Sequence, residues 1–227
     1  DEIKNWPDTV SLGFRASLPQ LEVKLSISHE KDLPILLDCK KQIYKLLGEH
    51  IIGEENTSLA NVLIELLQKE GATLTTAESC TGGLVASMLA KEPGASKVFH
   101  GSFITYSDAM KKNLLNVSED TLKSHGAVSE SVVREMARNA LMLSCAKFVI
   151  AVSGIAGPDG GTAEKPVGTV WLCWGNKDDL RTCQLLWPVE RTLFQTLVAA
   201  SGLDLVRRHI NKSSSLPSYL KRKLVSG

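Results

Sequence analysis

Hydroxyls, a thiol and a carboxylate follow one another closely in the stretch Thr75–Gly83, which reads Thr-Thr-Ala-Glu-Ser-Cys-Thr-Gly-Gly. The stretch comes after the apolar run 72–74 and before the helical pattern 84–90. A strand that leads through two glycines into a helix directs backbone N–H groups and the positive end of a helix dipole toward one point. Nucleophilic catalysis needs a hydroxyl or thiol, a base and such donors for an oxyanion. Ser79 is therefore a candidate nucleophile, and a serine N-cap at a tight turn is the alternative interpretation.

A thiol and two lysines add further candidates. A helix N-terminus lowers the pKa of a thiol, but nothing supplies Cys80 with an evident base, so it ranks below Ser79. No histidine lies near the glycine-rich loops in the sequence. A lysine becomes a base when burial lowers its pKa. Tyr106 and Lys111 could both face the same cleft, and spacing alone does not separate Lys111 from Lys112.

Three predicted strands end in small polar residues, at Glu78–Gly83, at Thr105–Ser107 and at Ser153–Gly157. In α/β proteins, ligands bind at the carboxyl ends of the strands. Glycines let a ligand approach the backbone, and successive N–H groups form an anion-binding nest, so a phosphate would fit here. The order of an ATP-binding P-loop and the G-x-G-x-x-G pattern are both absent from the sequence.

The composition is that of an ordinary globular protein, with 227 residues, 43% hydrophobic, 22% charged and a net charge of +1. No global charge favours nucleic acid or a membrane as a partner. The five cysteines are scattered and never form a C-x-x-C pair, and the histidines and single acids show no ligand spacing. We therefore expect a reduced, cytoplasmic protein without a metal or cofactor. The sequence shows no signal peptide and no spanning segment.

The first part of the chain, 1–53, is predicted to be a small α+β domain. The segments 9–14 and 21–27 alternate apolar and polar residues, which is the period of half-buried strands. The segment 32–47 has the 3.6-residue period of a helix. The polar break at 53–56 is the best domain boundary.

The following domain, 54–211, alternates strands and helices until a late antiparallel pair, which predicts a three-layer α/β/α sandwich on a mixed sheet. A helix over 191–210 closes it, and a basic tail, 212–227, follows. The predicted strands lie at 72–77, 97–106, 148–152, 167–174 and 180–187.

Several blocks, in one order over about 150 residues, resemble the C-terminal domain of the CinA family. They are Ala77–Gly83, Tyr106–Ser107 with Lys111 and Leu114–Leu115, His125–Ser129, and Gly154–Pro158 through Pro166–Val170. The resemblance implies an amidohydrolase that converts nicotinamide mononucleotide to nicotinate mononucleotide and ammonia. Residues 1–53 resemble the family's KH-like connecting domain. Full-length members carry a molybdopterin-binding-like domain before it, associated with metal-dependent pyrophosphatase activity. Because that domain is absent and the chain does not open with Met, we expect a fragment or a processed product.

The resemblance also implies roles for residues. Ser79 would attack the carboxamide carbon, Lys111 would accept its proton and Tyr106 would assist or orient. Gly154–Gly157 and Thr162 would hold the ribose phosphate or shape the pocket. The turn Cys80–Gly83 would offer backbone donors to the oxyanion. The expected substrate-binding residues are Glu78, Cys80, Thr81, Gly82, Gly83, Thr105, Gly154, Ile155, Ala156, Gly157, Thr162 and Arg191.

Two alternatives stay open. The sequence keeps Arg191 but has Thr192–Thr196 where many relatives have a second arginine, so a catalytically silent nucleotide-binding protein is the rival interpretation. RNA binding by the KH-like part is not indicated, because 1–53 contains no Gly-x-x-Gly loop. We expect a small nucleotide as partner, and neither a membrane nor nucleic acid. The apolar final helix and the tryptophans of the late strands would suit a homodimer or a larger homo-oligomer.

Overall fold

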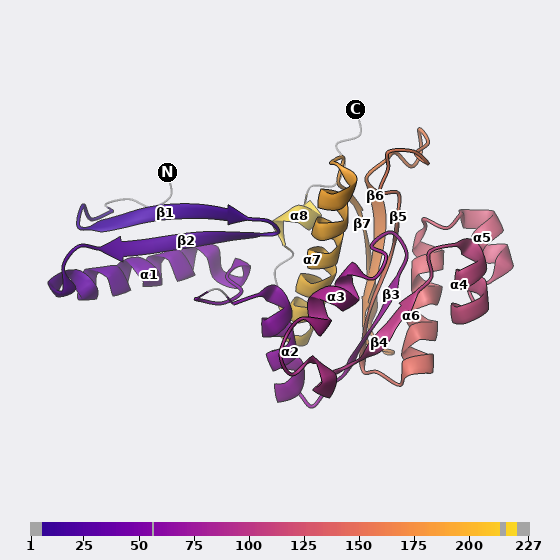
Figure 1. Ribbon diagram of the computed structural model, residues 1–227, viewed down its shortest axis with the longest axis horizontal. Helices are drawn as coiled ribbons and strands as arrows, with labels where there is room; N and C mark the ends of the chain where they lie inside the picture. Colours follow the sequence, from indigo (N-terminus) through magenta and orange to yellow (C-terminus); the bar gives the residue numbers. More distant parts are fainter. Residues whose placement is uncertain (1–5, 56, 214–216, 222–227) are drawn as a thin grey trace. The chain divides into compact units, whose positions relative to one another are not determined.

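The computed structural model describes residues 6–55, 57–213 and 217–221. The chain divides into two compact units, Asp1–Ile52 and Gly53–Gly227 (Figure 1). Within the described ranges, no helix combines the length and the apolar character that crossing a bilayer requires.

The first unit is a β-hairpin covered by one helix. Strands β1 (Val10–Ser17) and β2 (Gln20–Ile27) pair antiparallel, and α1 (Leu33–Leu47) packs on them. The buried side chains of Cys39 and Ile43 belong to α1. The predicted small α+β unit is confirmed as a separate two-stranded sheet with a helix, while its KH-like identity stays a prediction.

The second unit contains a five-stranded mixed sheet in the order β4-β3-β5-β6-β7. Strand β3 is parallel to both β4 and β5, and the β5–β6 and β6–β7 pairs are antiparallel. The strands are β3 (Leu74–Glu78), β4 (Phe99–Ile104), β5 (Phe148–Gly154), β6 (Thr169–Gly175) and β7 (Leu180–Leu186). Strands β3 and β5 are almost wholly buried, as expected for strands covered on both faces.

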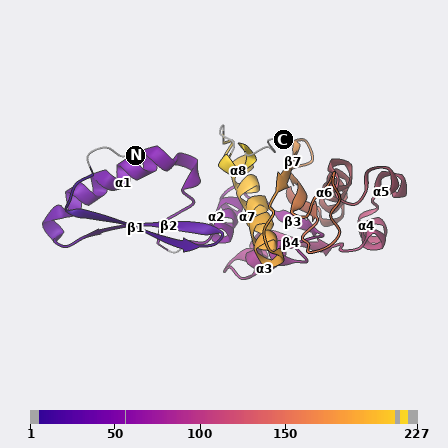
Figure 2. The same cartoon turned by 90° about the horizontal axis from the view of Figure 1, so that it is seen from above.

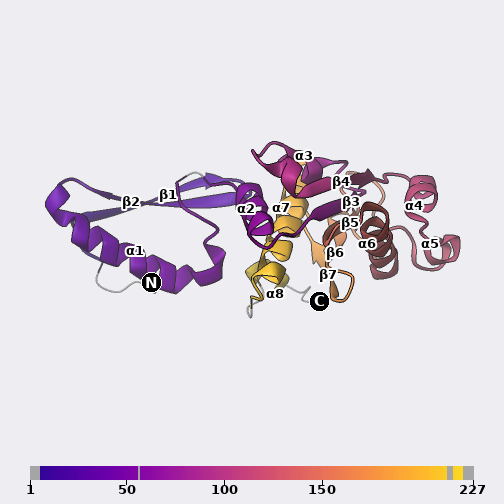
Figure 3. The same cartoon turned by 90° about the horizontal axis from the view of Figure 1, so that it is seen from below.

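Helices cover both faces of this sheet (Figures 2 and 3). Helix α7 (Arg191–Ile210) packs on β5 and β6, with α2 (Leu59–Lys69) and α3 (Leu84–Ala90) against it. Helix α6 (Glu130–Ser144) packs on β3, β5 and β6 from the other side and carries α4 (Asp108–Leu115) and α5 (Glu119–His125). The predicted three-layer α/β/α sandwich on a mixed sheet is confirmed.

Serine caps start four of the helices. In each, the hydroxyl oxygen of the N-cap serine accepts a hydrogen bond from a backbone N–H in the first turn, which replaces a bond that the helix cannot make internally. The caps are Ser58 on α2, Ser107 on α4, Ser118 on α5 and Ser129 on α6.

Part of the expected tail 212–227 is a short helix, α8 (Ser218–Lys221). The Tyr219 hydroxyl donates to the Asp204 carboxylate on α7 at 2.9 Å, so this segment is packed rather than fully solvated. Arg222 and Lys223, which belong to the predicted basic cluster, lie outside the described residues.

Close packing of α7 on β5 depends on Gly202. A Cβ atom at this position would lie 2.7 Å from Cγ2 of Ile150, which is closer than side-chain atoms pack. Helix propensity favours alanine over glycine by about 1 kcal/mol, and overpacking costs about 1–3 kcal/mol. We expect Gly202→Ala to lower the free energy of unfolding by about 1 kcal/mol, measured by urea denaturation. An increase in the free energy of unfolding of Gly202→Ala would show that the contact between α7 and β5 can accommodate a Cβ atom at this position.

Candidate active site

The loop after β3 is a tight turn that places Ser79 before the helix rather than on its cap. The N–H of Gly82 donates to the carbonyl oxygen of Ser79 at 3.1 Å. Gly83 is the N-cap residue of α3, with a φ of +102°, and a Cβ there would lie 2.9 Å from Ile104 Cδ1. Because both glycines have positive φ, α3 starts at Leu84. The serine N-cap interpretation of Ser79 is therefore wrong.

Ser79 and Lys111 meet at one carbonyl oxygen. The Ser79 hydroxyl donates to the carbonyl oxygen of Tyr106 at 3.5 Å, and Lys111 Nζ donates to the same oxygen at 3.3 Å. Ser79 comes from the end of β3, and Tyr106 and Lys111 come from the end of β4 and from α4. The parallel pairing of β3 with β4 brings these strand ends to one edge of the sheet.

Lys111 is nearly enclosed, with 1% of its surface exposed. Burial lowers its pKa below the ordinary value, and the Asp108 carboxylate, 3.4 Å from Nζ, opposes this shift. The neighbouring Lys112 faces solvent and forms an ion pair with Glu119 on α5. Lys111, and not Lys112, thus lies beside the candidate nucleophile.

The Cys80 thiol is buried, and burial raises its pKa to about 12. A thiol is nucleophilic as the thiolate, so this shift leaves Cys80 almost fully protonated near neutral pH. Its surroundings do not support the thiolate alternative. Its carbonyl oxygen accepts a hydrogen bond of 2.8 Å from Gln195 Nε2 on α7, which ties the loop to that helix.

Backbone donors remain at the turn itself. The N–H groups of Cys80 and Thr81 donate to no other residue in the described ranges. The N–H groups at the start of α3 are not available in this way, because those of Gly83, Val85 and Ala86 donate hydrogen bonds to the Glu78 carboxylate. Glu78 was expected to contact substrate, but its carboxylate is fully buried and bonded to the protein.

The second strand end carries Thr105 and Tyr106. Thr105 is fully buried, and among the described residues its hydroxyl has no hydrogen-bond partner. Tyr106 is 57% exposed, and its hydroxyl oxygen accepts a hydrogen bond of 2.6 Å from Arg191 Nη2. Arg191 Nη1 donates to the carbonyl oxygen of Gly157 at 2.7 Å. Arg191 therefore links the second strand end to the third.

The third strand end is the glycine-rich loop after β5. Gly154 ends β5, Ile155 donates its N–H to Thr169 at 2.8 Å, and Ala156 is buried. Gly157 has a φ of +76°, which favours glycine and turns the chain where Arg191 contacts it.

Thr162 lies further along this loop and is exposed. Its N–H donates to the carbonyl oxygen of Lys165, and its hydroxyl oxygen accepts from the Lys165 N–H. In the described part of the chain, no hydrogen bond joins Thr162 to the strand ends that carry Ser79 and Tyr106.

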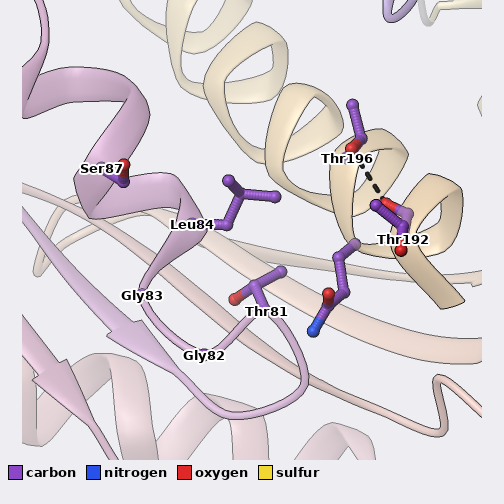
Figure 4. A pocket seen from close by; sticks show the side chains of 8 residues that line it. Thr81, Gly82, Gly83, Leu84, Ser87, Thr192 and Thr196 are labelled. Atoms are coloured by element: carbon purple, nitrogen blue, oxygen red, sulfur yellow. Dashed lines mark hydrogen bonds between the residues drawn. The ribbon is translucent and has the colours of Figure 1, made fainter.

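An open pocket of about 390 Å³ lies between the turn and the first two turns of α7 (Figure 4). In Figure 4, Leu84 of α3 and Thr192 and Thr196 of α7 lie on opposite sides of it. The lining side chains are uncharged. The pocket is lined by Thr81, Gly82, Gly83, Leu84, Ser87, Thr192, Gln195 and Thr196.

Five of the residues that line this pocket were not among the site residues expected from the sequence, because they belong to helix faces without a motif. They are Leu84, Ser87, Thr192, Gln195 and Thr196. The only signal in the sequence was the departure from the family pattern at 192–196, which falls at this pocket.

The described residues contain no group of three His, Cys, Asp or Glu side chains that could hold a metal ion. What they do contain is a serine hydroxyl, a buried amine, a tyrosine and an arginine at three neighbouring strand ends. Fold and site together define a class, an α/β/α protein with a serine–lysine pair at the carboxyl edge of a mixed sheet.

Comparison with known proteins identifies the family. Residues 56–210 match the family described as the CinA C-terminal domain. The chain is 46% identical over 226 residues to a CinA-like protein of Colwellia psychrerythraea, covering 98% of this chain and 52% of that protein. The chain belongs to the CinA family.

A second relative carries a more specific name. The nicotinamide-nucleotide amidohydrolase PncC of Shewanella oneidensis is 36% identical over 214 residues, covering 94% of this chain and 50% of that protein. The chain thus spans about half the length of these two curated relatives.

Solved structures agree in fold. The competence/damage inducible protein CihA of Agrobacterium tumefaciens aligns with a TM-score of 0.65 at 37% identity, covering 67% of this chain and 93% of that one. A CinA superfamily protein of Klebsiella pneumoniae aligns with a TM-score of 0.66 at 33% identity, covering 68% and 96%.

Proposed function

We propose that this chain is an amidohydrolase that converts nicotinamide mononucleotide to nicotinate mononucleotide and ammonia without a metal. The observation that carries the proposal is that Ser79 and the buried Lys111 both donate to the Tyr106 carbonyl oxygen. The turn beside them has two N–H groups, those of Cys80 and Thr81, that donate to no other residue in the described ranges. The PncC name of the Shewanella oneidensis relative supports the choice of substrate. The direct test is enzymatic detection of ammonia released from the mononucleotide.

In the first half of the reaction, neutral Lys111 accepts the hydroxyl proton of Ser79 as Oγ bonds to the carboxamide carbon. The carbonyl electron pair moves to oxygen, and the N–H groups of Cys80 and Thr81 stabilise that oxyanion. When the intermediate collapses, the C–N bond breaks and Lys111 returns the proton to the leaving amino group, which departs as ammonia.

In the second half, water attacks the ester that Ser79 carries. Lys111 takes a proton from the water as its oxygen bonds to the acyl carbon, and the proton passes to Ser79 Oγ when the ester bond breaks. Nicotinate mononucleotide leaves as a carboxylate, and its acid proton goes to solvent. A lysine serves both steps because burial lowers its pKa, so that a neutral amine is more available.

The substrate phosphate is assigned to Arg191 and the glycine-rich loop. The guanidinium has five N–H donors, and the bonds to Tyr106 and Gly157 use only part of them. A phosphate beside Arg191 would gain charge-assisted hydrogen bonds. In this arrangement the turn after Ser79 is left for the oxyanion, so the two negatively charged groups use separate donors.

We expect Arg191→Ala to weaken binding of nicotinamide mononucleotide by about 10- to 100-fold, because the phosphate would lose one or two charge-assisted hydrogen bonds. Binding is measured by isothermal titration calorimetry in the Ser79→Ala background, which prevents turnover. Nicotinamide riboside, which lacks the phosphate, is the control ligand, and its affinity should change little. An equal loss for both ligands would place the phosphate elsewhere.

The rival function is nucleotide binding without turnover. It is supported by the uncharged lining of the pocket at Thr192, Gln195 and Thr196, which adds no cation to Arg191 for a phosphate. Calorimetry separates the two functions, because tight binding of the mononucleotide by the unmodified chain with no ammonia released favours the rival.

For the first unit we propose the KH-like connecting role that its resemblance implies. The hairpin β1–β2 with α1 supports this assignment, as does the division of the chain at Ile52. The small nucleotide remains the proposed partner of the second unit.

A further inference from the structure

The Glu78 carboxylate immediately precedes Ser79 in the chain but points to the other face of the sheet. Ala77 packs into the core cluster with Val133 and Met136 of α6. Successive side chains of a strand alternate between its faces, so Glu78 points toward the layer of α3 and α7. It is fully buried there, and the proposed mechanism does not use it.

One carboxylate oxygen holds both the turn and the start of α3. Glu78 Oε2 accepts hydrogen bonds from the Thr81 hydroxyl at 2.7 Å, from the Gly83 N–H at 3.0 Å and from the Val85 N–H at 3.1 Å. Oε1 accepts from the Ala86 N–H at 2.8 Å. A carboxylate at a helix N-terminus is stabilised by these donors and by the helix dipole. The first N–H groups of α3 are thus occupied by the protein itself.

The strand side of the carboxylate is held separately. The Thr76 hydroxyl lies 3.2 Å from Oε1 and 2.6 Å from the Ser102 hydroxyl, which lies 3.4 Å from Oε1. These two hydroxyls belong to β3 and β4, so they anchor Glu78 without touching the turn.

The backbone around Glu78 is fixed as well. Its carbonyl oxygen accepts a 2.8 Å bond from the Thr105 N–H, and the Ser79 N–H donates to Val152 at 3.1 Å. Between these fixed points and Gly83, two side chains hold the turn: the Thr81 hydroxyl donates to Glu78, and Gln195 Nε2 of α7 donates to the Cys80 carbonyl oxygen. Of these two contacts, only that of Thr81 depends on the Glu78 carboxylate. Cys80 and Thr81 are the central residues of that turn, and their N–H groups stay unused in the described ranges.

We propose that Glu78 is a positioning residue for the proposed reaction, holding the turn through the Thr81 hydroxyl so that the N–H groups of Cys80 and Thr81 receive the oxyanion formed at Ser79. The inference rests on the proposed function. It assigns Glu78 an indirect role, in which its carboxylate accepts hydrogen bonds from α3 and from the turn and does not contact the substrate.

The test compares two buried threonines that each place one hydroxyl on Glu78. Thr81→Val and Thr76→Val are isosteric, and only Thr81 lies in the turn. We expect Thr81→Val to lower kcat for ammonia release by about 30-fold with KM within about threefold, as for a partly misplaced oxyanion donor. Thr76→Val should keep kcat within about threefold of the unmodified chain. We expect the two substitutions to lower the melting temperature by similar amounts.

Glu78→Gln is the second variant, in case Thr81→Val does not fold. The glutamine amide has one acceptor oxygen, and its NH₂ group would face N–H donors. We expect the same selective fall in kcat in a variant whose circular dichroism spectrum is unchanged. Equal, small effects of all three substitutions on kcat, together with lower stability, would mean that Glu78 has only a structural role and would overturn the inference.

A readout without the proposed substrate keeps the two proposals apart. A fluorophosphonate probe phosphonylates an activated serine with loss of fluoride, and intact-mass spectrometry follows its rate at Ser79. We expect labelling of Thr81→Val to be about 30-fold slower than of the unmodified chain, and labelling of Thr76→Val to be unchanged. If this pattern holds but no ammonia is released from the mononucleotide, the proposed substrate fails and the positioning role stands. Equal labelling rates, or no labelling of the unmodified chain, would overturn the positioning role.

Discussion

Replacing Ser79 by alanine is expected to lower the rate of ammonia release from nicotinamide mononucleotide by about 10⁴-fold, because loss of a catalytic nucleophile removes the covalent route altogether. The side chain is small and sits at a turn fixed by the backbone, with the Gly82 N–H on the Ser79 carbonyl and the Ser79 N–H on Val152. The substitution should therefore leave the turn in place, and calorimetry should still detect the mononucleotide.

Ser144→Ala is the matched control for this experiment. Ser144 ends α6 and donates its hydroxyl to the Ala140 carbonyl, far along the chain from the turn. It should keep full activity. Undiminished ammonia release by Ser79→Ala would remove the nucleophile assignment, and Cys80, whose thiol is held protonated by burial, would not replace it.

The second large effect is expected at Lys111. Lys111→Met keeps the approximate length of the buried aliphatic chain and removes the amine that acts as the base. We expect kcat/KM to fall by about 10³-fold. The exposed neighbour provides the control, since Lys112→Met removes only an ion pair with Glu119 and should leave kcat/KM within about twofold. Comparable losses in both variants would indicate a general effect of charge and not a base.

The pH dependence has a defined sign. The neutral amine of Lys111 is the active form, so kcat/KM should rise with pH and level off above its pKa, which burial lowers below 10.5. The Asp108 carboxylate raises that pKa, so Asp108→Asn should move the rising limb to lower pH. If the rising limb of kcat/KM in Asp108→Asn stays at the same pH, or moves to higher pH, another group controls the pH profile.

Stability should follow the same linkage. Because the pKa of Lys111 is lower in the folded chain, the unfolded chain binds more protons between the folded pKa and 10.5. Lys111 therefore makes the free energy of unfolding increase as pH rises through this window. Urea denaturation as a function of pH should show a smaller increase for Lys111→Met than for the unmodified chain.

Much of the fold could be predicted from local patterns. Alternating residues predicted the hairpin of the first unit, and the apolar run at 148–152 predicted the central strand β5. The last helix was predicted over its observed range, Arg191–Ile210. These predictions succeeded because periodicity and capping act within a few residues of chain.

Element ends were less predictable, for local reasons. Strand β4 is shorter than the predicted 97–106, because Ala95–Lys97 forms a single 3-10 turn. The start of helix α3 at Leu84 depends on Gly82 and Gly83, which both adopt positive φ and so stay outside the helix. A sequence does not state which φ a glycine adopts, since glycine permits both signs.

By itself, the sequence determined which chemical groups stand at the strand ends: Ser79 with its glycine turn, Tyr106 with Lys111, and the loop at Gly154–Gly157. Only the tertiary structure decided how those groups are used. Burial distinguishes Lys111 from Lys112, and it gives the Cys80 thiol a raised pKa. The alternation of side chains along β3 sends Glu78 to the α3 face and Ser79 toward α4, so the carboxylate and the hydroxyl of adjacent residues serve different neighbours. Desolvation and hydrogen-bond partners come from segments distant in the chain, and no local pattern encodes them.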